Sequence, residues 1–440
     1  MLIFGTDGIR ARFNTEPLTE ATIGRLSLVL KQWLPPKATV VLGRDTRETG
    51  PQLLFWLTSA WEHVTIVDLG VVPTPVVAFE TAARKADLGI MATASHNPSC
   101  DNGLKFFASD GSKIVKSQAD QWSHAVLENK TQTQHTLNTQ PGYELKQAET
   151  AEPVHYSNFL KRHFQPNPGK FVFDLANGAA CPWVEKWIQF FFPNAIVMGN
   201  KPNGTNINRE IGALHPELLA EKVKAEQAMA GFAFDGDADR LVVINQHGET
   251  VHGDRVLFGL SSLIKNNKHV VTTILAGLGL EEACKRCGLT LSRTAVGDQN
   301  VLFEMLKSGA LVGGEPSGHF ISADLFAAGD GFLNALRVAS AITKQASFLT
   351  NLIDLVPLYP QFEQAYPVSM KPPLNRQKRI AIALTSLEKA LRSGQNPSGR
   401  VILRYSGTEM KIRLFIEAKD LAPFQKNIDN LIQAIQEELQ

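Results

Sequence analysis

The sequence has few cysteines, almost no net charge and no long apolar run. Its 440 residues include four cysteines, and 44 Lys+Arg balance 43 Asp+Glu to a formal charge of +1. Without a basic excess, the chain lacks the electrostatic footprint of a nucleic-acid-binding protein. No stretch reaches the ~18 consecutive apolar residues that a membrane-spanning helix needs. A hydrophobic content of 44% also excludes an intrinsically disordered chain.

The first residues, MLIFGTDGIRAR, have neither the charged start nor the apolar core of a signal peptide, so a cytoplasmic location is expected. A low cysteine count fits a reducing compartment. Cys284 and Cys287 form a C-x-x-C, but no second pair accompanies them. Two small buried thiols on a helix are therefore favoured over a zinc site.

Short apolar runs that end in polar or glycine-bearing turns alternate with segments of helical length. The strands expected from this pattern are residues 39–45, 64–70, 88–95, 170–178, 194–199, 231–237, 241–248, 269–275, 289–297 and 310–318. Residues 50–61 have helical length between the first two. Such alternation predicts α/β units with parallel or mixed sheets.

The remaining segments differ in composition. Residues 117–150 are polar and are expected to form a helix and a connecting segment, whereas the proline-rich stretch 357–373 is typical of a linker. Strands are expected at 379–385 and 401–418, followed by a closing helix. We therefore predict three similar α/β domains with mixed sheets and a smaller C-terminal α+β domain. The boundaries expected are 1–150, 151–254, 255–365 and 366–440.

The most informative motif is DGDADR, residues 235–240, directly after the apolar run GFAF. Asp235, Asp237 and Asp239 can converge on one hard cation, since Mg²⁺ and Ca²⁺ prefer oxygen ligands. A solvated acidic turn is the alternative. An EF-hand loop would need Gly and Glu where Arg240 and Gln246 stand. An aspartyl-phosphatase motif fits poorly, because Asp239 holds its fifth position.

Three further motifs are weak singly. TASHNP (93–98) presents Ser95 at a strand end, but no G-x-S-x-G surrounds it, so a structural turn is equally compatible. GGEPSGH (313–319) offers Glu315 and Ser317 to sugar hydroxyls, or is a glycine-rich surface turn. RYSGTE (404–409), with Arg413 nearby, suits a phosphate or is an ordinary hairpin turn.

Taken together with FGTDGIR (4–10), these motifs describe a metal triad, an exposed serine, a hydroxyl-reading loop and a phosphate-binding loop on separate modules. Phosphoryl transfer depends mainly on positioning and on stabilisation by metal and cationic groups. In this order the five motifs resemble the α-D-phosphohexomutase superfamily, across nearly the whole chain. The stretches ASHNPSCDNGLKFFASDG, FDLANGAA, KPNGTNIN and SGTEMKIR are most similar to its bacterial glucosamine-phosphate branch.

The resemblance implies four domains around a central active-site cleft and an enzyme that is an intramolecular phosphotransferase. It implies that Ser95 carries a phosphoryl group and joins Asp235, Asp237 and Asp239 in holding one Mg²⁺. A hexosamine 1,6-bisphosphate would be intermediate and activator between glucosamine 6-phosphate and glucosamine 1-phosphate. The product would feed UDP-N-acetylglucosamine and cell-wall precursor synthesis.

The resemblance also assigns the remaining site residues. Arg10, Lys105 and His319 match catalytic positions, with Lys105 and His319 as candidates for the general base, since Arg10 stays protonated. The substrate-binding positions are Arg240, Glu315, Ser317, Arg404, Ser406, Gly407, Thr408 and Arg413. The partner expected is a small sugar phosphate, with no nucleic acid and no membrane, and the chain is expected to be a monomer or homodimer.

The chain departs from the family pattern at Ala238, Gln299, Asn300, Pro316, Tyr405 and Met410. The changes at Gln299, Asn300 and Pro316 leave open a preference for glucose or mannose phosphates, because these segments face the substrate in the family. Two other interpretations are a non-catalytic sugar-phosphate binding protein and a metal-dependent phosphatase. Sustained release of inorganic phosphate would identify the phosphatase.

Overall fold

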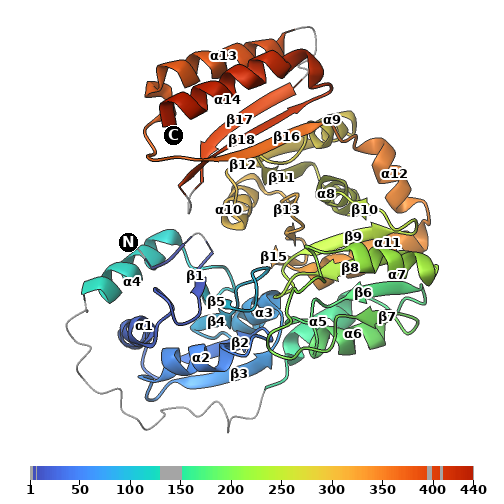
Figure 1. The fold of residues 1–440 in the computed structure, drawn as a ribbon. Helices are drawn as coiled ribbons and strands as arrows, with labels where there is room; N and C mark the ends of the chain where they lie inside the picture. The colour runs from blue at the N-terminus through green and yellow to red at the C-terminus, as the bar shows by residue number, and fades with distance from the viewer. Residues whose placement is uncertain (1–2, 6, 129–150, 394–398, 407–409, 440) are drawn as a thin grey trace. The chain divides into compact units, whose positions relative to one another are not determined.

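The computed structural model describes residues 3–5, 7–128, 151–393, 399–406 and 410–439 (Figure 1). The chain divides into two compact units, residues 1–275 with 287–354 and residues 276–286 with 355–440. The first unit contains three five-stranded mixed sheets and the second a three-stranded antiparallel sheet. The fold class expected from the sequence is confirmed. Within the described ranges, every helix is too short or too polar to cross a membrane.

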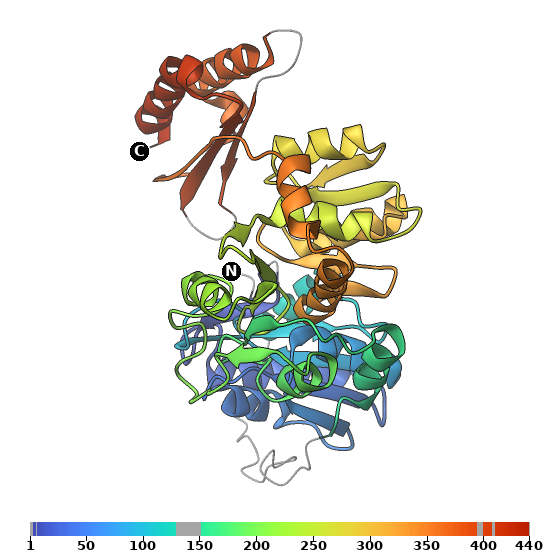
Figure 2. The same ribbon diagram turned by 90° about the vertical axis from the view of Figure 1, so that its right-hand side faces the viewer.

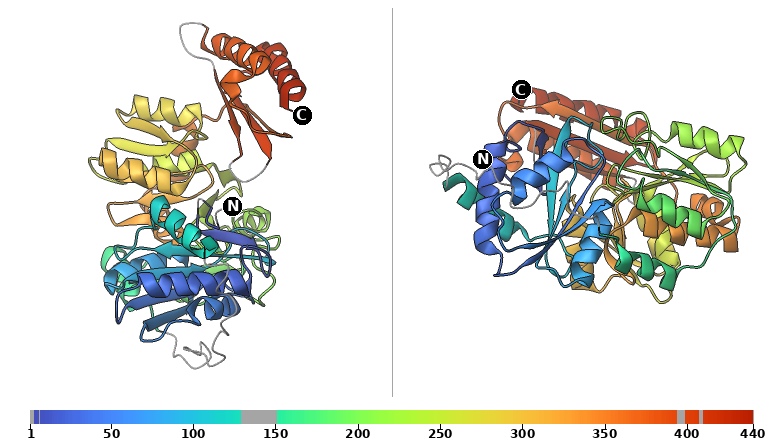
Figure 3. Two further views of the ribbon diagram at one scale, coloured as in Figure 1. Left: turned by 90° about the vertical axis from the view of Figure 1, so that its left-hand side faces the viewer. Right: turned by 90° about the horizontal axis from the view of Figure 1, so that it is seen from below.

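The first sheet has the spatial order β1-β5-β4-β2-β3. Its strands are β1 (Ile9–Arg12), β2 (Thr39–Arg44), β3 (Thr65–Val71), β4 (Leu88–Ala92) and β5 (Asp101–Phe107). The helices are α1 (Glu20–Trp33), α2 (Gly50–Thr58), α3 (Thr74–Ala83) and α4 (Lys116–Glu128). Helices cover both faces of this sheet (Figure 3). Val40 and Leu42 of β2 share a core with α1, α2 and α4. Gly43 faces α3 so closely that an added Cβ would lie 2.4 Å from Val77.

The second sheet has the order β10-β9-β8-β6-β7. Its strands are β6 (Phe171–Asp174), β7 (Ile196–Met198), β8 (Ala230–Phe234), β9 (Leu241–Asn245) and β10 (Thr250–Val251). The accompanying helices are α5 (Val154–His163), α6 (Trp183–Phe191) and α7 (Glu217–Ala225). One face packs phenylalanines against each other, with the Phe173 and Phe232 rings 5.2 Å apart. The other packs Val172 and Ile244 against Leu219 of α7, as alternation along a strand requires.

The third sheet has the order β12-β11-β13-β14-β15. Its strands are β11 (His269–Thr273), β12 (Thr290–Thr294), β13 (Val312–Gly314), β14 (Phe320–Ser322) and β15 (Phe326–Gly329). The helices here are α8 (Gly253–Ser262), α10 (Asp298–Ser308), α11 (Gly331–Lys344) and α12 (Phe348–Leu355). Helix α10 packs Val301 and Met305 against Val271 and Ile321 of the sheet. Strands β4, β8 and β13 lead into the segments that contain Ser95, Asp235 and Glu315.

The second unit has the sheet order β16-β18-β17. Its strands are β16 (Gln361–Pro367), β17 (Gly399–Tyr405) and β18 (Lys411–Ala418). Its α-helices are α9 (Leu278–Arg286), α13 (Lys378–Arg392) and α14 (Gln425–Leu439). Two short 3₁₀ helices, η2 (Leu374–Arg376) and η3 (Ala422–Phe424), complete the unit. Figure 2 shows α13 and α14 on one face of the sheet. Helix α9 comes from earlier in the chain and belongs here, since Leu278 N donates to Glu417 Oε1 over 3.0 Å.

Two sequence predictions in the second unit were wrong. The expected strand 379–385 lies inside helix α13. The alternating apolar residues at its start suggest a strand, but Ile380, Leu387 and Leu391 lie on one helical face and are buried. The expected linker 357–373 contains β16, which pairs with β18 and lies across the boundary expected at 365/366. Its mostly exposed edge position explains why proline at its end is tolerated.

Candidate active site

Ser95 lies on the loop after β4 with a backbone φ of 52°, an unusual value for a residue other than glycine. Ser95 N donates to Thr93 Oγ1 over 2.9 Å, and the Thr93 hydroxyl donates to Asp45 Oδ2 over 2.7 Å. These bonds fix the turn from within. In this conformation the Ser95 hydroxyl donates to Asp235 Oδ2 over 2.6 Å. This bond joins the serine loop, residues 93–101 from the end of β4 to the first residue of β5, to the acidic loop that follows β8 in the second sheet.

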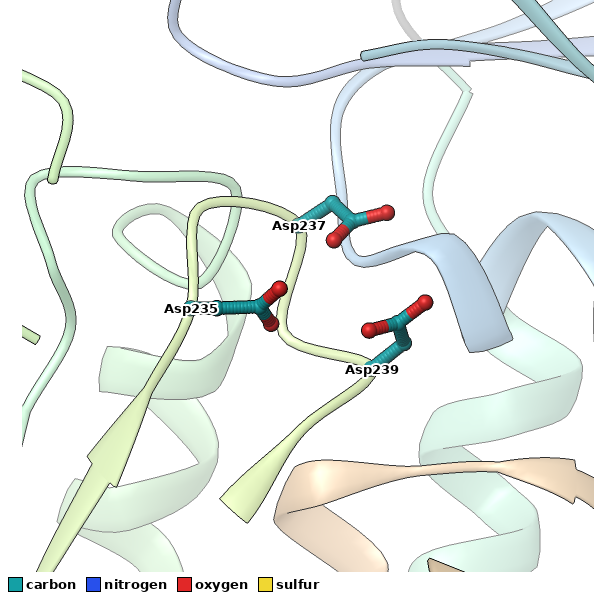
Figure 4. Close-up of side chains that lie close together, drawn as sticks. All are labelled: Asp235, Asp237 and Asp239. Atoms are coloured by element: carbon teal, nitrogen blue, oxygen red, sulfur yellow. The ribbon is translucent and has the colours of Figure 1, made fainter. Parts of the chain in front are cut away.

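The acidic loop, residues 235–240, connects β8 to β9 and brings three buried carboxylates together (Figure 4). Asp235, Asp237 and Asp239 each offer an oxygen, and these atoms lie within 4.8 Å of one another. Gly236 allows this approach, since an added Cβ would lie 2.5 Å from the Ser95 carbonyl oxygen. The sequence prediction that these aspartates converge is confirmed.

The three carboxylates repel one another when they are ionised, which makes ionisation of each less favourable. Burial and then the charges of Asp239 and Asp237 raise the pKa of Asp235 to about 7. Burial would also raise the pKa of Asp239, but Lys105 and His319 lower it well below the usual range. The loop is therefore a concentrated anionic centre that requires cations.

The donor set fits a hard divalent cation. Asp237 Oδ1 and Asp239 Oδ1 are buried and have no hydrogen-bond partner, although His319 Nδ1 lies 3.6 Å from the latter. Orphaned buried carboxylate oxygens are costly unless a ligand satisfies them. With Ser95 Oγ beside Asp235, the loop offers only oxygen atoms, which favours Mg²⁺ over softer metals.

Lys105 lies on β5 and is buried against the acidic loop. Its Nζ is 2.8 Å from Asp237 Oδ2 and 2.8 Å from Asp239 Oδ2. Burial lowers the pKa of Lys105, but Asp237 and Asp239 raise it well above its ordinary value. Lys105 is thus protonated in this arrangement and faces the centre, as the resemblance implied.

Two arginines bring further positive charge to the serine loop. Arg10 of β1 donates through Nη1 to Asn97 Oδ1 over 3.3 Å. Arg240 is the last residue of the acidic loop, with Nε 3.9 Å from Asp235 Oδ2. Burial, together with Arg240 and Arg10, lowers the pKa of His96 to about 4. These two guanidinium groups offer positive charge to an anion such as a phosphate on the serine loop.

The loop of residues 313–319 lies against the acidic loop. Leu241 N donates to the Gly318 carbonyl over 2.9 Å, and a Cβ on Gly318 would lie 2.5 Å from the Leu241 carbonyl oxygen. Glu315 Oε1 accepts from Gly297 N over 3.1 Å, and Glu315 also contributes to raising the pKa of Arg240. Ser317 is exposed on this loop. The structure therefore places Glu315 near the acidic loop.

His319 lies between two carboxylates. Its Nδ1 is 3.6 Å from Asp239 Oδ1 and its Nε2 is 3.3 Å from Asp298 Oδ2. Burial lowers the pKa of His319, but Asp239 and Asp298 raise it above its ordinary value. The local sequence does not identify Asp298 as a site residue, because its partners His319 and Lys113 are brought to it only by the fold.

Sequence reasoning also missed Lys113 and Asp7. Lys113 Nζ contacts Asp7 Oδ1, and it lies 2.5 Å from Asp298 Oδ2. Nothing in the local sequence distinguishes this lysine, since its partners are 106 and 185 residues away. A cavity of about 320 Å³ adjoins the network; among its lining residues are Asp298, His319, Phe303 and Leu306.

The predicted phosphate loop belongs to the second unit. Arg404 of β17 and Arg413 of β18 are directly opposite each other. Burial and then the charge of Arg413 lower the pKa of Arg404. Ser406 is buried, and its carbonyl accepts from Lys371 Nζ over 2.6 Å. Gly407 and Thr408 lie outside the described residues.

The cysteines do not form a metal centre in the described ranges. Cys284 is buried on α9, as expected. The expectation of a second buried thiol on the helix is wrong for Cys287, which is exposed and follows the last residue of α9. The Asp235–Asp237–Asp239 triad is the one group of three or more metal-ligating side chains found there.

Family profiles match most of the chain. The profiles described as phosphoglucomutase/phosphomannomutase, alpha/beta/alpha domains I, II and III, match residues 1–133, 152–248 and 252–359. A curated relative, the phosphoglucosamine mutase of Thermodesulfovibrio yellowstonii, is 35% identical over 448 residues. That alignment covers 98% of each chain.

Solved structures share the fold. A phosphoglucomutase/phosphomannomutase family protein from Burkholderia thailandensis superposes with a TM-score of 0.77 at 23% identity, covering 99% of this chain and 97% of that one. Aspergillus fumigatus N-acetylphosphoglucosamine mutase, in complex with GlcNAc-6P and magnesium, superposes with a TM-score of 0.64 at 16% identity. That alignment covers 100% of this chain and 96% of the other.

Proposed function

Because the chain belongs to the phosphoglucomutase/phosphomannomutase family, we propose that it interconverts glucosamine 6-phosphate and glucosamine 1-phosphate. The enzyme is an isomerase that moves a phosphoryl group within a hexose phosphate. The glucosamine preference is supported by the curated relative that aligns over 98% of both chains, which is named phosphoglucosamine mutase. The alternative is a phosphomannomutase or phosphoglucomutase, suggested by Gln299, Asn300 and Pro316.

The observation that carries the mechanism is the 2.6 Å contact between Ser95 Oγ and Asp235 Oδ2. In the proposed reaction, phospho-Ser95 transfers its phosphoryl group to O1 of glucosamine 6-phosphate. The Oγ–P bond breaks as the O1–P bond forms; the O1 proton passes to a base, and Ser95 Oγ takes up a proton to become a hydroxyl. After the 1,6-bisphosphate turns over in the site, the O6–P bond breaks as the Oγ–P bond forms again. The Ser95 hydroxyl gives up its proton, O6 takes one up, and glucosamine 1-phosphate remains.

In this proposal Asp235, Asp237 and Asp239 would hold Mg²⁺ together with the Ser95 phosphate. When bound, the ion offsets negative charge on the transferring phosphoryl group. Arg10 and Arg240 bring fixed positive charge to the same place without a later reorganisation. Lys105 and His319, which both face Asp239, are the candidates for the general base. Either group would have to release its own proton before it accepts that of the hydroxyl.

Recognition of the substrate is assigned to two loops. Glu315 and Ser317 would read sugar hydroxyls, and the exposure of Ser317 is compatible with that role. Arg404, Arg413 and Ser406, with Gly407 and Thr408, would hold the phosphate that does not react. Like charges directly across an antiparallel pair are destabilising, so an anion between Arg404 and Arg413 would relieve their repulsion.

The proposal extends to the setting of the reaction. We assign the four domains to residues 1–150, 151–254, 255–365 and 366–440. One sheet lies in each of the first three parts, and the fourth sheet also takes in the start of β16, before residue 366. The product would enter UDP-N-acetylglucosamine and cell-wall precursor synthesis in the cytoplasm. A hexosamine 1,6-bisphosphate would prime Ser95, and the enzyme would act as a monomer or a homodimer.

The test is a coupled assay with Mg²⁺ and a trace of hexose 1,6-bisphosphate. It compares glucosamine 6-phosphate, glucose 1-phosphate and mannose 1-phosphate, with Ser95→Ala as the matched control. We expect glucosamine 6-phosphate to have the highest kcat/KM and the alanine variant to be inactive.

Other outcomes separate the alternatives. A higher kcat/KM for glucose or mannose phosphate would assign the enzyme to that sugar. Steady release of inorganic phosphate would identify a phosphatase. No turnover with Ser95 intact and phosphorylated would leave a sugar-phosphate binding protein.

A further inference from the structure

Arg47 is a fully buried arginine for which the proposed mechanism has no use. It follows β2, and its Nε donates to Asp45 Oδ2 over 2.9 Å. The backbone N of Arg47 donates to Asp45 Oδ1 over 3.0 Å. A buried guanidinium is costly unless its charge is paired and its N–H groups are satisfied. The Asp45 carboxylate supplies the opposite charge and accepts the Nε–H group. The four N–H groups on Nη1 and Nη2 still need acceptors.

All four of these N–H groups have a partner in the serine loop. Nη2 donates to the carbonyl oxygens of Ser95 over 3.1 Å and Asn97 over 2.8 Å. Nη1 donates to the carbonyl of Pro98, and to that of Asp101 over 2.9 Å. Arginine has five side-chain N–H donors, so every donor of Arg47 is used on Asp45 or on this loop.

Asn208 contacts the same loop from the segment between β7 and α7. Its Nδ2 lies 2.9 Å from the Ser95 carbonyl oxygen and 3.3 Å from that of Asn97. These are two of the carbonyls that Arg47 holds. Asn208 is also held on the side of the acidic loop. Its backbone N donates to the Ala176 carbonyl over 2.9 Å, and a Cβ added to Gly236 of the acidic loop would lie 2.8 Å from Asn208 Nδ2.

We propose that Arg47 and Asn208 are positioning residues that set the place of the Ser95 hydroxyl relative to the acidic loop. The left-handed conformation of Ser95 persists because the surrounding contacts determine it. Holding the Ser95 and Asn97 carbonyls fixes the direction of the Ser95 side chain. The inference rests on the proposed function of Ser95 as the phosphoryl carrier.

The variant that tests this role is Asn208→Asp. Aspartate has the shape of asparagine and tolerates the left-handed backbone of Asn208, whose φ is 58°. Its ionised carboxylate cannot donate, and it would face two carbonyl oxygens. The matched control is Asn206→Asp on the same segment, since Asn206 Nδ2 donates over 3.0 Å to the Lys201 carbonyl, away from the site.

We expect Asn208→Asp to lower kcat by roughly 10–100-fold, because a misplacement of about 1 Å costs on the order of 10²-fold in rate. KM for the sugar phosphate should stay within about twofold, since Asn208 is not proposed to contact substrate. Phosphorylation of Ser95 by glucose 1,6-bisphosphate, followed by intact mass, should slow by a similar factor. Asn206→Asp should match the wild type in all three.

Unchanged kcat in a folded Asn208→Asp protein would overturn the proposal, as would a rise in KM alone. A purely structural role would lower the melting temperature and leave kcat per folded molecule intact. Arg47→Lys is the second variant, since it keeps the positive charge beside Asp45 but lacks the planar guanidinium. A wild-type kcat in the folded Arg47→Lys protein would also contradict the proposal. Ser95→Ala is run in parallel: if it remains active, the proposed function fails instead.

Discussion

Asp174, at the end of β6, is a buried carboxylate with two backbone partners. Its Oδ1 accepts from Ala176 N over 2.9 Å and its Oδ2 from Gly212 N over 2.8 Å. Burial raises the pKa of Asp174 from 3.8 to about 6, against the effect of these two bonds. The Asp174 carboxyl group therefore titrates near pH 6, where the folded protein can be studied.

The raised pKa predicts how stability depends on pH. Between pH 3.8 and about 6 the folded state holds a proton that the unfolded state has released, so stability falls as pH rises. The loss is about 3 kcal/mol, at about 1.4 kcal/mol per pKa unit. We expect the melting temperature of the wild type relative to Asp174→Asn to decrease from pH 4 to pH 7. A difference that is constant with pH would contradict this assignment.

At the scale of single elements, helix α13 shows a clear division between buried and exposed faces. Ile380, Leu387 and Leu391 are fully buried in the core of the second unit, whereas Ile382 is 72% exposed. Most of the stability of such a helix comes from packing of its apolar face and not from local propensity.

This division predicts opposite outcomes for two truncations on α13. Leu387→Ala should destabilise the second unit by about 2–5 kcal/mol, because it removes buried methyl groups and leaves a cavity. Ile382→Ala should change stability by less than about 0.5 kcal/mol, since its side chain is exposed. Chemical denaturation followed by far-UV circular dichroism would compare them. Equal losses would mean that the face assignment is wrong.

The sequence predicted most strands of the first unit and missed elements whose signals are not local. Strands β8 and β11 are buried apolar runs, which sequence patterns identify well. The start of α13 resembles a strand, because its alternating Ile and Ala residues fit the two-residue period of a strand as well as the 3.6-residue period of a helix. Only when Leu387 and Leu391 are included does the helical period fit better. Strand β16 was missed, because its pairing with β18 is decided by residues about fifty positions away.

The candidate site shows the same limit. Ser95 and the three aspartates stand in compact motifs, so the sequence predicts them. Asn208 and Lys113 act on partners 113 and 185 residues away. Asn208 closes the stretch KPNGTNIN, but that stretch does not indicate a contact with the Ser95 carbonyl, and Lys113 stands in no motif. Such side chains are defined by the folded packing of one sheet against another, which a local pattern does not contain.

At the scale of the whole molecule, the aromatic residues divide unevenly between the two units. All six tryptophans, at positions 33, 56, 61, 122, 183 and 187, belong to the first unit. The acidic loop belongs to the same unit. Tryptophan fluorescence therefore reports on the unit that would bind the metal, and far-UV circular dichroism reports on both units.

We predict that Mg²⁺ raises the melting temperature seen by tryptophan fluorescence and that a chelator reverses the change. At a concentration one hundred times Kd, a ligand that binds only the folded state contributes about 2.7 kcal/mol. Asp237→Asn should abolish the shift, because it removes one of the three carboxylates. Asp120→Asn, at an exposed ion pair on α4, should retain it. An identical Mg²⁺ shift in both variants would place the ion elsewhere.

Helix α9 gives the molecule an unusual order of synthesis. The chain passes between the two units after residues 275, 286 and 354, so α9 leaves the ribosome long before the strands it packs with. At about 5–20 residues per second, the 154 residues from 287 to 440 take roughly 8–30 s to translate. During that time the α9 surface that later meets Glu417 and Pro357 has no partner. Chaperone capture of the nascent chain should therefore concentrate in this interval.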